Sequence, residues 1–147
     1  MKMLAVLVLA VLPACGGGAG SSAAPAPATP LPNSIRLVSA PTTVFVPLGL
    51  TRPSVVFTFD VGVERGINNG AFGVFFGPMP ATASNACALA TAALPTIGAG
   101  GITRVSTTAP LVLCTPPFTT TSIGAFFGAG GTTIFSTDIP FTIIWTR

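Results

Sequence analysis

Apolar and polar residues alternate most clearly in the stretch SVVFTFDVGVE. Val55, Phe57, Phe59, Val61 and Val63 fall on one side of it, and the residues between them are mostly polar or small. Successive side chains of a β-strand point to opposite faces of the sheet. The pattern therefore predicts a strand with one buried face.

A turn sequence, RGINNG, follows this strand. Asn-Asn-Gly tolerates positive φ and is typical of hairpin turns, so we expect residues 71–76 to return as the partner strand. Near the C-terminus the alternation recurs, with Phe141, Ile143 and Trp145 on one side. Thr142, Ile144 and Thr146 lie on the other.

Further short segments with strand character are separated by turn sequences such as GLTRP and GAGG. They cover residues 35–40, 43–48, 102–107, 111–115, 119–127 and 132–135. Short strands at this spacing predict an all-β fold, a single antiparallel β-sandwich of Ig-like or fibronectin-like pattern over residues 33–147. Prolines in or beside the strands blunt its sheet edges: Pro41, Pro47, Pro53 and Pro140.

One segment, TASNACALATAALP, fits two kinds of structure. Its alanines favour a short helix near 84–94, capped by Ser84 or Asn85 and ended by Pro95. A strand is the alternative, and the pattern leaves both open.

The N-terminal segment differs from the rest of the chain. Met3–Leu12 is a continuous apolar run behind Lys2, and it is shorter than the roughly 20 residues of a membrane-spanning helix. Leu12-Pro13-Ala14-Cys15 resembles the lipobox of bacterial lipoproteins, an aliphatic residue and two mostly small residues before a cysteine. The resemblance covers Met1 to about Gly20 and does not extend to the domain.

This resemblance implies a signal peptide at 1–14 and a covalent lipid on Cys15, the only cofactor expected. The protein would then be anchored at the cell envelope on its extracytoplasmic side, and Gly16 favours the outer membrane if the cell is Gram-negative. Residues 15–32 would form a Gly/Ser/Ala/Pro tether. The alternative is an ordinary secretory signal cut near Ala14, with Cys15 a spare thiol.

Two cysteines remain beyond Cys15. An even pair in an exported domain predicts a disulfide between Cys87 and Cys114. Two separate buried thiols are the alternative. A metal site is not expected, because two sulfurs without histidine supply too few ligands.

Composition limits the chemistry further. Only 6% of the residues are charged, the six cations are scattered and histidine is absent. Nucleic-acid binding and Ser-His-Asp catalysis are therefore not expected, and neither is any enzyme. Asp60 and Glu64 are weak calcium candidates, with Asn68, Asn69 and Asp138 as further oxygen donors; solvated charges on a half-exposed sheet are the more ordinary interpretation.

Two similar pieces, GVFFG and GAFFG, carry adjacent phenylalanines: Phe75 with Phe76, and Phe126 with Phe127. Neighbouring side chains on a strand point to opposite faces, so one of each pair can enter the core. The others lie under a cover or form an exposed patch for a partner. The flanks of the two pieces do not match, which argues against duplication.

Two functions fit these features. The first is a lipid-anchored, non-enzymatic binding or accessory module at the envelope, whose partner is an envelope protein or a glycan. The second is a structural subunit of a surface assembly that adds strands to its neighbours by β-augmentation. The sequence does not determine the oligomeric state.

Overall fold

The computed structural model describes residues 31–49, 55–78, 80, 82, 84–108 and 111–147. Within these ranges the chain forms strands and no helix, which confirms the all-β class. The strands are β1 (Ser34–Ser39), β2 (Thr43–Phe45), β3 (Phe57–Val63), β4 (Gly70–Phe76), β5 (Ala88–Leu94), β6 (Gly101–Thr107), β7 (Leu111–Val112), β8 (Phe118–Ala129) and β9 (Thr132–Thr146).

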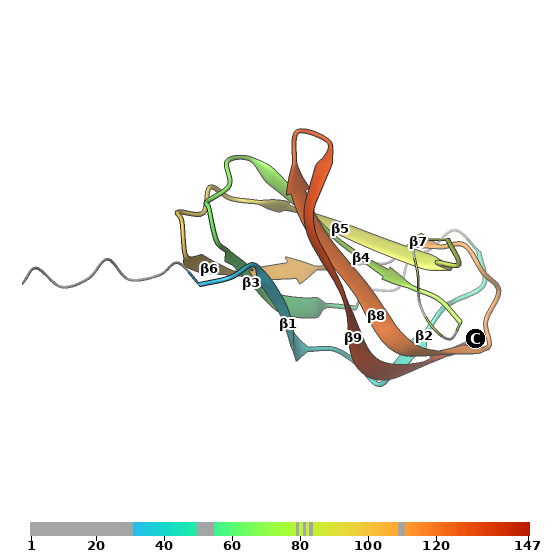
Figure 1. The fold of residues 1–147 in the computed structure, drawn as a ribbon. Coiled ribbons are helices and arrows are strands. Elements are labelled where there is room, and N and C mark those ends of the chain that lie inside the picture. The colour runs from blue at the N-terminus through green and yellow to red at the C-terminus, as the bar shows by residue number, and fades with distance from the viewer. Residues whose placement is uncertain (1–30, 50–54, 79, 81, 83, 109–110) are drawn as a thin grey trace, which may run out of the picture.

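The strands form two sheets that face each other (Figure 1). The smaller has the order β1-β3-β6, and the larger has the order β2-β9-β8-β4-β5-β7. Two facing sheets were expected and are present, but the larger of them is not purely antiparallel. The larger sheet is curled. It is also mixed, because the chain crosses from β1 to the other layer, where β2 runs parallel to the end of β9.

The predicted hairpin between residues 57–63 and 71–76 is wrong. β3 pairs with β1 and β6, whereas β4 pairs with β5 and β8. The intervening turn, with Gly66 at φ 79° and Asn69 at φ 50°, carries the chain from one sheet to the other. The inward faces of β3 and β4 thus meet across the core, where the rings of Phe59 and Phe72 lie 5.1 Å apart.

The short helix expected near 84–94 is not formed, because this segment contains strand β5. Ala88, Ala90 and Leu94 point inward and are buried, while Leu89 on the other side is 40% exposed. The spacing of the buried residues is that of a strand. The helix propensity of alanine is a weak preference, and tertiary packing between β4 and β7 overrides it.

Aromatic rings fill the centre of the core around Trp145. Its indole is fully buried, stacks on Phe118 at 5.3 Å between ring centroids and meets the edge of Phe76 at 5.5 Å. The indole N–H donates to the hydroxyl of Thr120 at 3.0 Å. The alternation predicted at the C-terminus is confirmed here, with Ile143 buried as well and Ile144 exposed.

β8 and β9 form a long hairpin whose loop is Gly130-Gly131. Both glycines have positive φ, 57° and 78°, as a type I′ turn requires. β9 continues through Pro140, although the sequence suggested two separate segments here. The proline is tolerated because β2 pairs only with residues 144–146, so no described strand pairs with this edge of β9 near Pro140.

Candidate functional site

The outer face of the larger sheet carries the two phenylalanines left outside the core. In the antiparallel register of β4 and β8, Phe75 lies opposite Gly124 and Phe126 lies opposite Gly73. Each ring covers the glycine of the neighbouring strand, and a Cβ added at either glycine would overlap that ring. The rings are half-buried and 6.3 Å apart between centroids. Aromatic side chains placed over glycines in this way compensate for the missing glycine side chain.

The other member of each pair belongs to the core. Phe76 and Phe127 are fully buried, as expected for one residue of each pair, and they cannot take part in a surface patch. The predicted partner patch is therefore reduced to Phe75 and Phe126. Leu89, on the neighbouring strand β5, lies opposite Phe75 and extends the apolar surface.

We expect the Phe75–Gly124 contact to show as coupling between mutations. Phe75→Ala alone should cost about 0.5–1 kcal/mol, the value of a cross-strand pair. In a Gly124→Ala background the new methyl group displaces the ring, so Phe75→Ala should cost close to nothing. Urea unfolding of the four proteins of this cycle measures the coupling. As a control, Ile144→Ala on the outer face of β9 should be additive with Gly124→Ala, and an additive Phe75 pair would contradict the contact.

Three charged residues lie side by side on the outer face of the smaller sheet. Asp60 of β3 lies between Arg36 of β1 and Arg104 of β6, which are its partners in the register. Arg36 Nη2 lies 3.0 Å from Asp60 Oδ2, and Arg104 Nε lies 2.9 Å from Oδ1. The hydrogen bonds from Arg104 and then from Arg36 lower the pKa of Asp60 below its ordinary value.

This lowered pKa predicts how stability changes with acidity. A carboxyl whose pKa is lowered in the folded state stabilises the fold above its unfolded pKa, about 3.9, and that contribution is lost as the pH falls through the folded value. Asp60→Asn should therefore weaken the fold near neutral pH and make its stability less sensitive to acid. Thermal unfolding between about pH 6 and pH 2 measures both. An Asp138→Asn control tests another carboxyl, and equal acid sensitivity in the Asp60 variant and the parent would contradict the assignment.

The weak calcium candidates are not brought together around one point. Both carboxylate oxygens of Asp60 accept hydrogen bonds from arginines. Glu64 is four residues further on, about 13 Å along an extended strand, and its backbone N–H donates to Asn33 Oδ1 at 2.9 Å. In the described ranges, no three side chains from His, Cys, Asp or Glu gather in one place. Asp60 is thus a carboxylate that pairs with an arginine on each of the two neighbouring strands.

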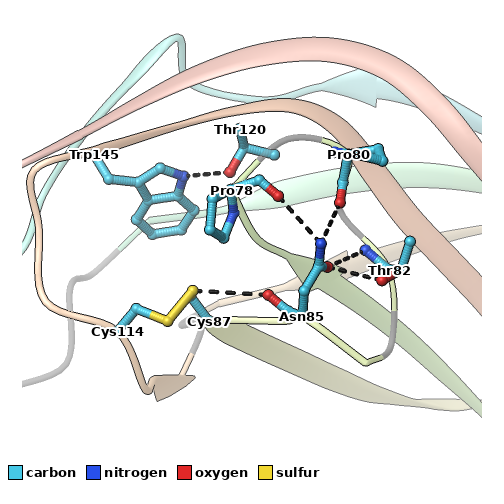
Figure 2. The surroundings of a disulfide bond; sticks show 8 residues. All are labelled: Pro78, Pro80, Thr82, Asn85, Cys87, Cys114, Thr120 and Trp145. Carbon is cyan, nitrogen blue, oxygen red and sulfur yellow. Dashed lines mark hydrogen bonds between the residues drawn. A yellow bond between two sulfur atoms is a disulfide. The ribbon is translucent and has the colours of Figure 1, made fainter.

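Cys87 and Cys114 form a disulfide with a sequence separation of 27 (Figure 2). Cys87 directly precedes β5, and its carbonyl accepts from the N–H groups of Leu113 and Cys114. The two-residue strand β7 is therefore attached to β5 by two backbone pairs and by this bridge just beyond it.

The side chain of Asn85 forms hydrogen bonds within the loop that precedes the disulfide, a role that the sequence did not predict. Its amide nitrogen donates to the carbonyl of Pro80 at 2.6 Å (Figure 2). Its carbonyl oxygen accepts from the backbone N–H of Thr82 at 2.6 Å and from the hydroxyl of Thr82 at 2.8 Å. The expected helix cap is instead an asparagine that closes a turn, which is a common use of this side chain.

Cys15, the predicted lipid attachment site, and the rest of segments 1–14 and 15–30 lie outside the described residues. No helix in the described part of the chain has the length and hydropathy needed to cross a membrane. Comparison with protein-family models, with curated protein sequences and with solved structures finds no match. The assignment of function therefore depends on the residues themselves.

Proposed function

We propose that this chain is an exported lipoprotein, held in the cell envelope by lipid on Cys15, whose β-domain is a non-enzymatic binding or accessory module. The observation that carries the proposal is the order of the N-terminal features: a short apolar run, then Leu12-Pro13-Ala14-Cys15, then a Gly/Ser/Ala/Pro segment before the domain. The Cys87–Cys114 disulfide supports it, since such bonds persist in oxidising, extracytoplasmic compartments.

The surface of the domain suits a module that presents one face to a partner. The outer face of the larger sheet carries Phe75, Phe126 and Leu89 among small residues, with one exposed carboxylate, Asp138, opposite Gly124. The Arg36–Asp60–Arg104 cluster lies on the smaller sheet. An apolar, weakly charged face is typical of sites that bind another protein. An envelope protein is therefore the proposed partner, ahead of a glycan.

The anchor is tested by the intact mass of the chain purified from bacterial membranes. We expect the mass of residues 15–147 plus covalent acyl chains. Cys15→Ser should abolish the added mass and release the protein from the membrane fraction, while Ser22→Ala, a neighbouring substitution, should change neither. A parent chain that begins at Cys15 but carries no added acyl mass would refute the anchor.

The second function, a structural subunit of a surface assembly, is supported by one edge of β1, which pairs with no strand in the described part of the chain. Cross-linking in intact cells followed by mass spectrometry separates the two functions. A binding module should be recovered with one foreign protein. A ladder of self-multiples would instead favour the structural subunit.

A further inference from the structure

The outer face of the smaller sheet consists of three rows of residues that cross β1, β3 and β6, the three strands of one layer in Figure 1. Residues opposite one another in the register point to the same face. The rows are Ser34, Gly62 and Ile102, then Arg36, Asp60 and Arg104, then Ser39, Thr58 and Ser106. Within these three strands, the charged residues all lie in the middle row.

The two arginines of this row converge on one atom. Nη2 of Arg36 lies 3.0 Å from Asp60 Oδ2, and Nη2 of Arg104 lies 3.3 Å from the same oxygen. Like charges repel each other, so the shared carboxylate is what holds the two guanidiniums this close together. The arginine side chains are nevertheless 77% and 63% exposed. Asp60 therefore fixes a pair of guanidiniums that a ligand can reach from solvent.

The cluster keeps both positive charge and hydrogen-bond donors. Two guanidiniums against one carboxylate leave a net positive charge at this place. Arg36 uses one N–H group on Asp60 and Arg104 uses two, and neither side chain donates to any other described residue. A guanidinium has more donors than these. The unused N–H groups of both arginines are therefore available to an anion.

The net charge of the cluster favours a carboxylate as this anion. A single carboxylate cancels the remaining positive charge, and its two oxygens match the planar N–H groups of arginine. A phosphate monoester carries roughly two negative charges, and the carboxylate of Asp60 would repel it more strongly. A surface of anionic lipids attracts clusters of several basic residues, each adding about 1 kcal/mol, so one net charge gives little attraction.

The rows on either side of the cluster suit a carboxylate that belongs to a polypeptide. The hydroxyls of Thr58 and Ser106 lie 3.2 Å apart on one side, and hydroxyl groups both donate to and accept from a peptide backbone. Ile102 on the other side is 61% exposed and offers an apolar contact. Arginine is itself enriched in protein–protein interfaces. The face thus combines a charge contact with polar and apolar contacts beside it.

We propose that the Arg36–Asp60–Arg104 cluster is a recognition site for an acidic protein segment, in which both guanidiniums bind the carboxylate of one Asp or Glu side chain. Asp60 holds the arginines in place, and their unused N–H groups bind the partner. The inference goes beyond the proposed function, because it concerns the sheet opposite Phe75 and Phe126. It also holds whether or not Cys15 carries lipid.

A fluorescently labelled hexaglutamate peptide tests the site in the full-length chain, purified in a neutral detergent. Fluorescence anisotropy should show saturable binding that weakens as salt is added, and a hexaserine peptide should not bind. Arg36→Gln and Arg104→Gln should each weaken the binding about tenfold, since each removes hydrogen bonds to a charged group. Arg65→Gln removes an exposed positive charge from the turn after β3 and should leave the binding nearly unchanged.

Lysine variants separate geometry from charge. Arg36→Lys and Arg104→Lys keep the positive charge but lose the planar donors, so both should weaken the binding, whereas Arg65→Lys should not. Inorganic phosphate and phosphatidylglycerol vesicles should displace the peptide poorly, and circular dichroism confirms that every variant folds. The proposal would be overturned by a peptide that does not bind, by equal loss in Arg65→Gln, by full binding in both lysine variants, or by vesicles that bind as tightly as the peptide.

Discussion

Trp145→Ala is expected to destabilise the domain by about 3–5 kcal/mol, the usual cost of truncating a fully buried large aromatic residue. Trp145 lies between Phe118 and Phe76, and both lose a ring contact when it is removed. The substitution also leaves the buried hydroxyl of Thr120 without its indole donor. A domain of this size has about 5–15 kcal/mol of stability in all, so the loss is a large share of it.

The measurement is urea unfolding followed by far-UV circular dichroism, because Trp145 is the only tryptophan and its fluorescence is lost in the variants. Trp145→Phe is the control. It retains an aromatic ring and should cost clearly less than the alanine variant. If the alanine variant unfolded within about 1 kcal/mol of the parent, the central position of Trp145 in the core would be contradicted.

Removing the disulfide should have the second largest effect. The double variant Cys87→Ala/Cys114→Ala is expected to lose about 3 kcal/mol, because the bridge closes a long loop in the unfolded chain. The double variant is used since either single variant leaves a free thiol. β7 should also be held less tightly, because only its two backbone pairs with β5 and the hydrogen bonds to the carbonyl of residue 87 then remain.

Thermal unfolding with and without a reducing agent measures the global effect, and hydrogen exchange in β5 measures the local one. The amide protons of β5 that bond to β7 should exchange faster in the double variant, while those of β3 change only with global stability. The parent treated with reductant should match the double variant. Equal midpoints for oxidised and reduced parent would show that the bridge adds no stability.

The fold illustrates what an alternating pattern can and cannot predict. Alternation identified β3 and the end of β9 because each buries one face, and those faces are the core of the molecule. The pattern records which side of a strand is buried but not which strand lies beside it. The Ile67–Asn69 turn was therefore predicted to close a hairpin, although it joins two sheets that face each other.

The segment that forms β5 was also ambiguous, since its local sequence fitted both a helix and a strand. Alanine fits both a helix and a strand. Which alanines of β5 point inward therefore depends on the large side chains packed against them, which the local sequence does not identify. Of the candidate sites, one was predicted from the sequence and one was not. The Cys87–Cys114 disulfide was predicted from pairing and compartment, whereas the arginines around Asp60 were not, because they come from strands 24 and 44 residues away.

The Phe75 and Phe126 contacts have a consequence for how recurring motifs are interpreted. Two antiparallel strands are related by a local dyad normal to the sheet, so each position and its surroundings on one strand recur, reversed in direction, on the other. GVFFG and GAFFG occupy equivalent places about such a dyad between β4 and β8. Their likeness is explained by one steric problem solved twice, glycine under an aromatic ring. A short motif that repeats between unlike flanks can thus identify two neighbouring strands and their register.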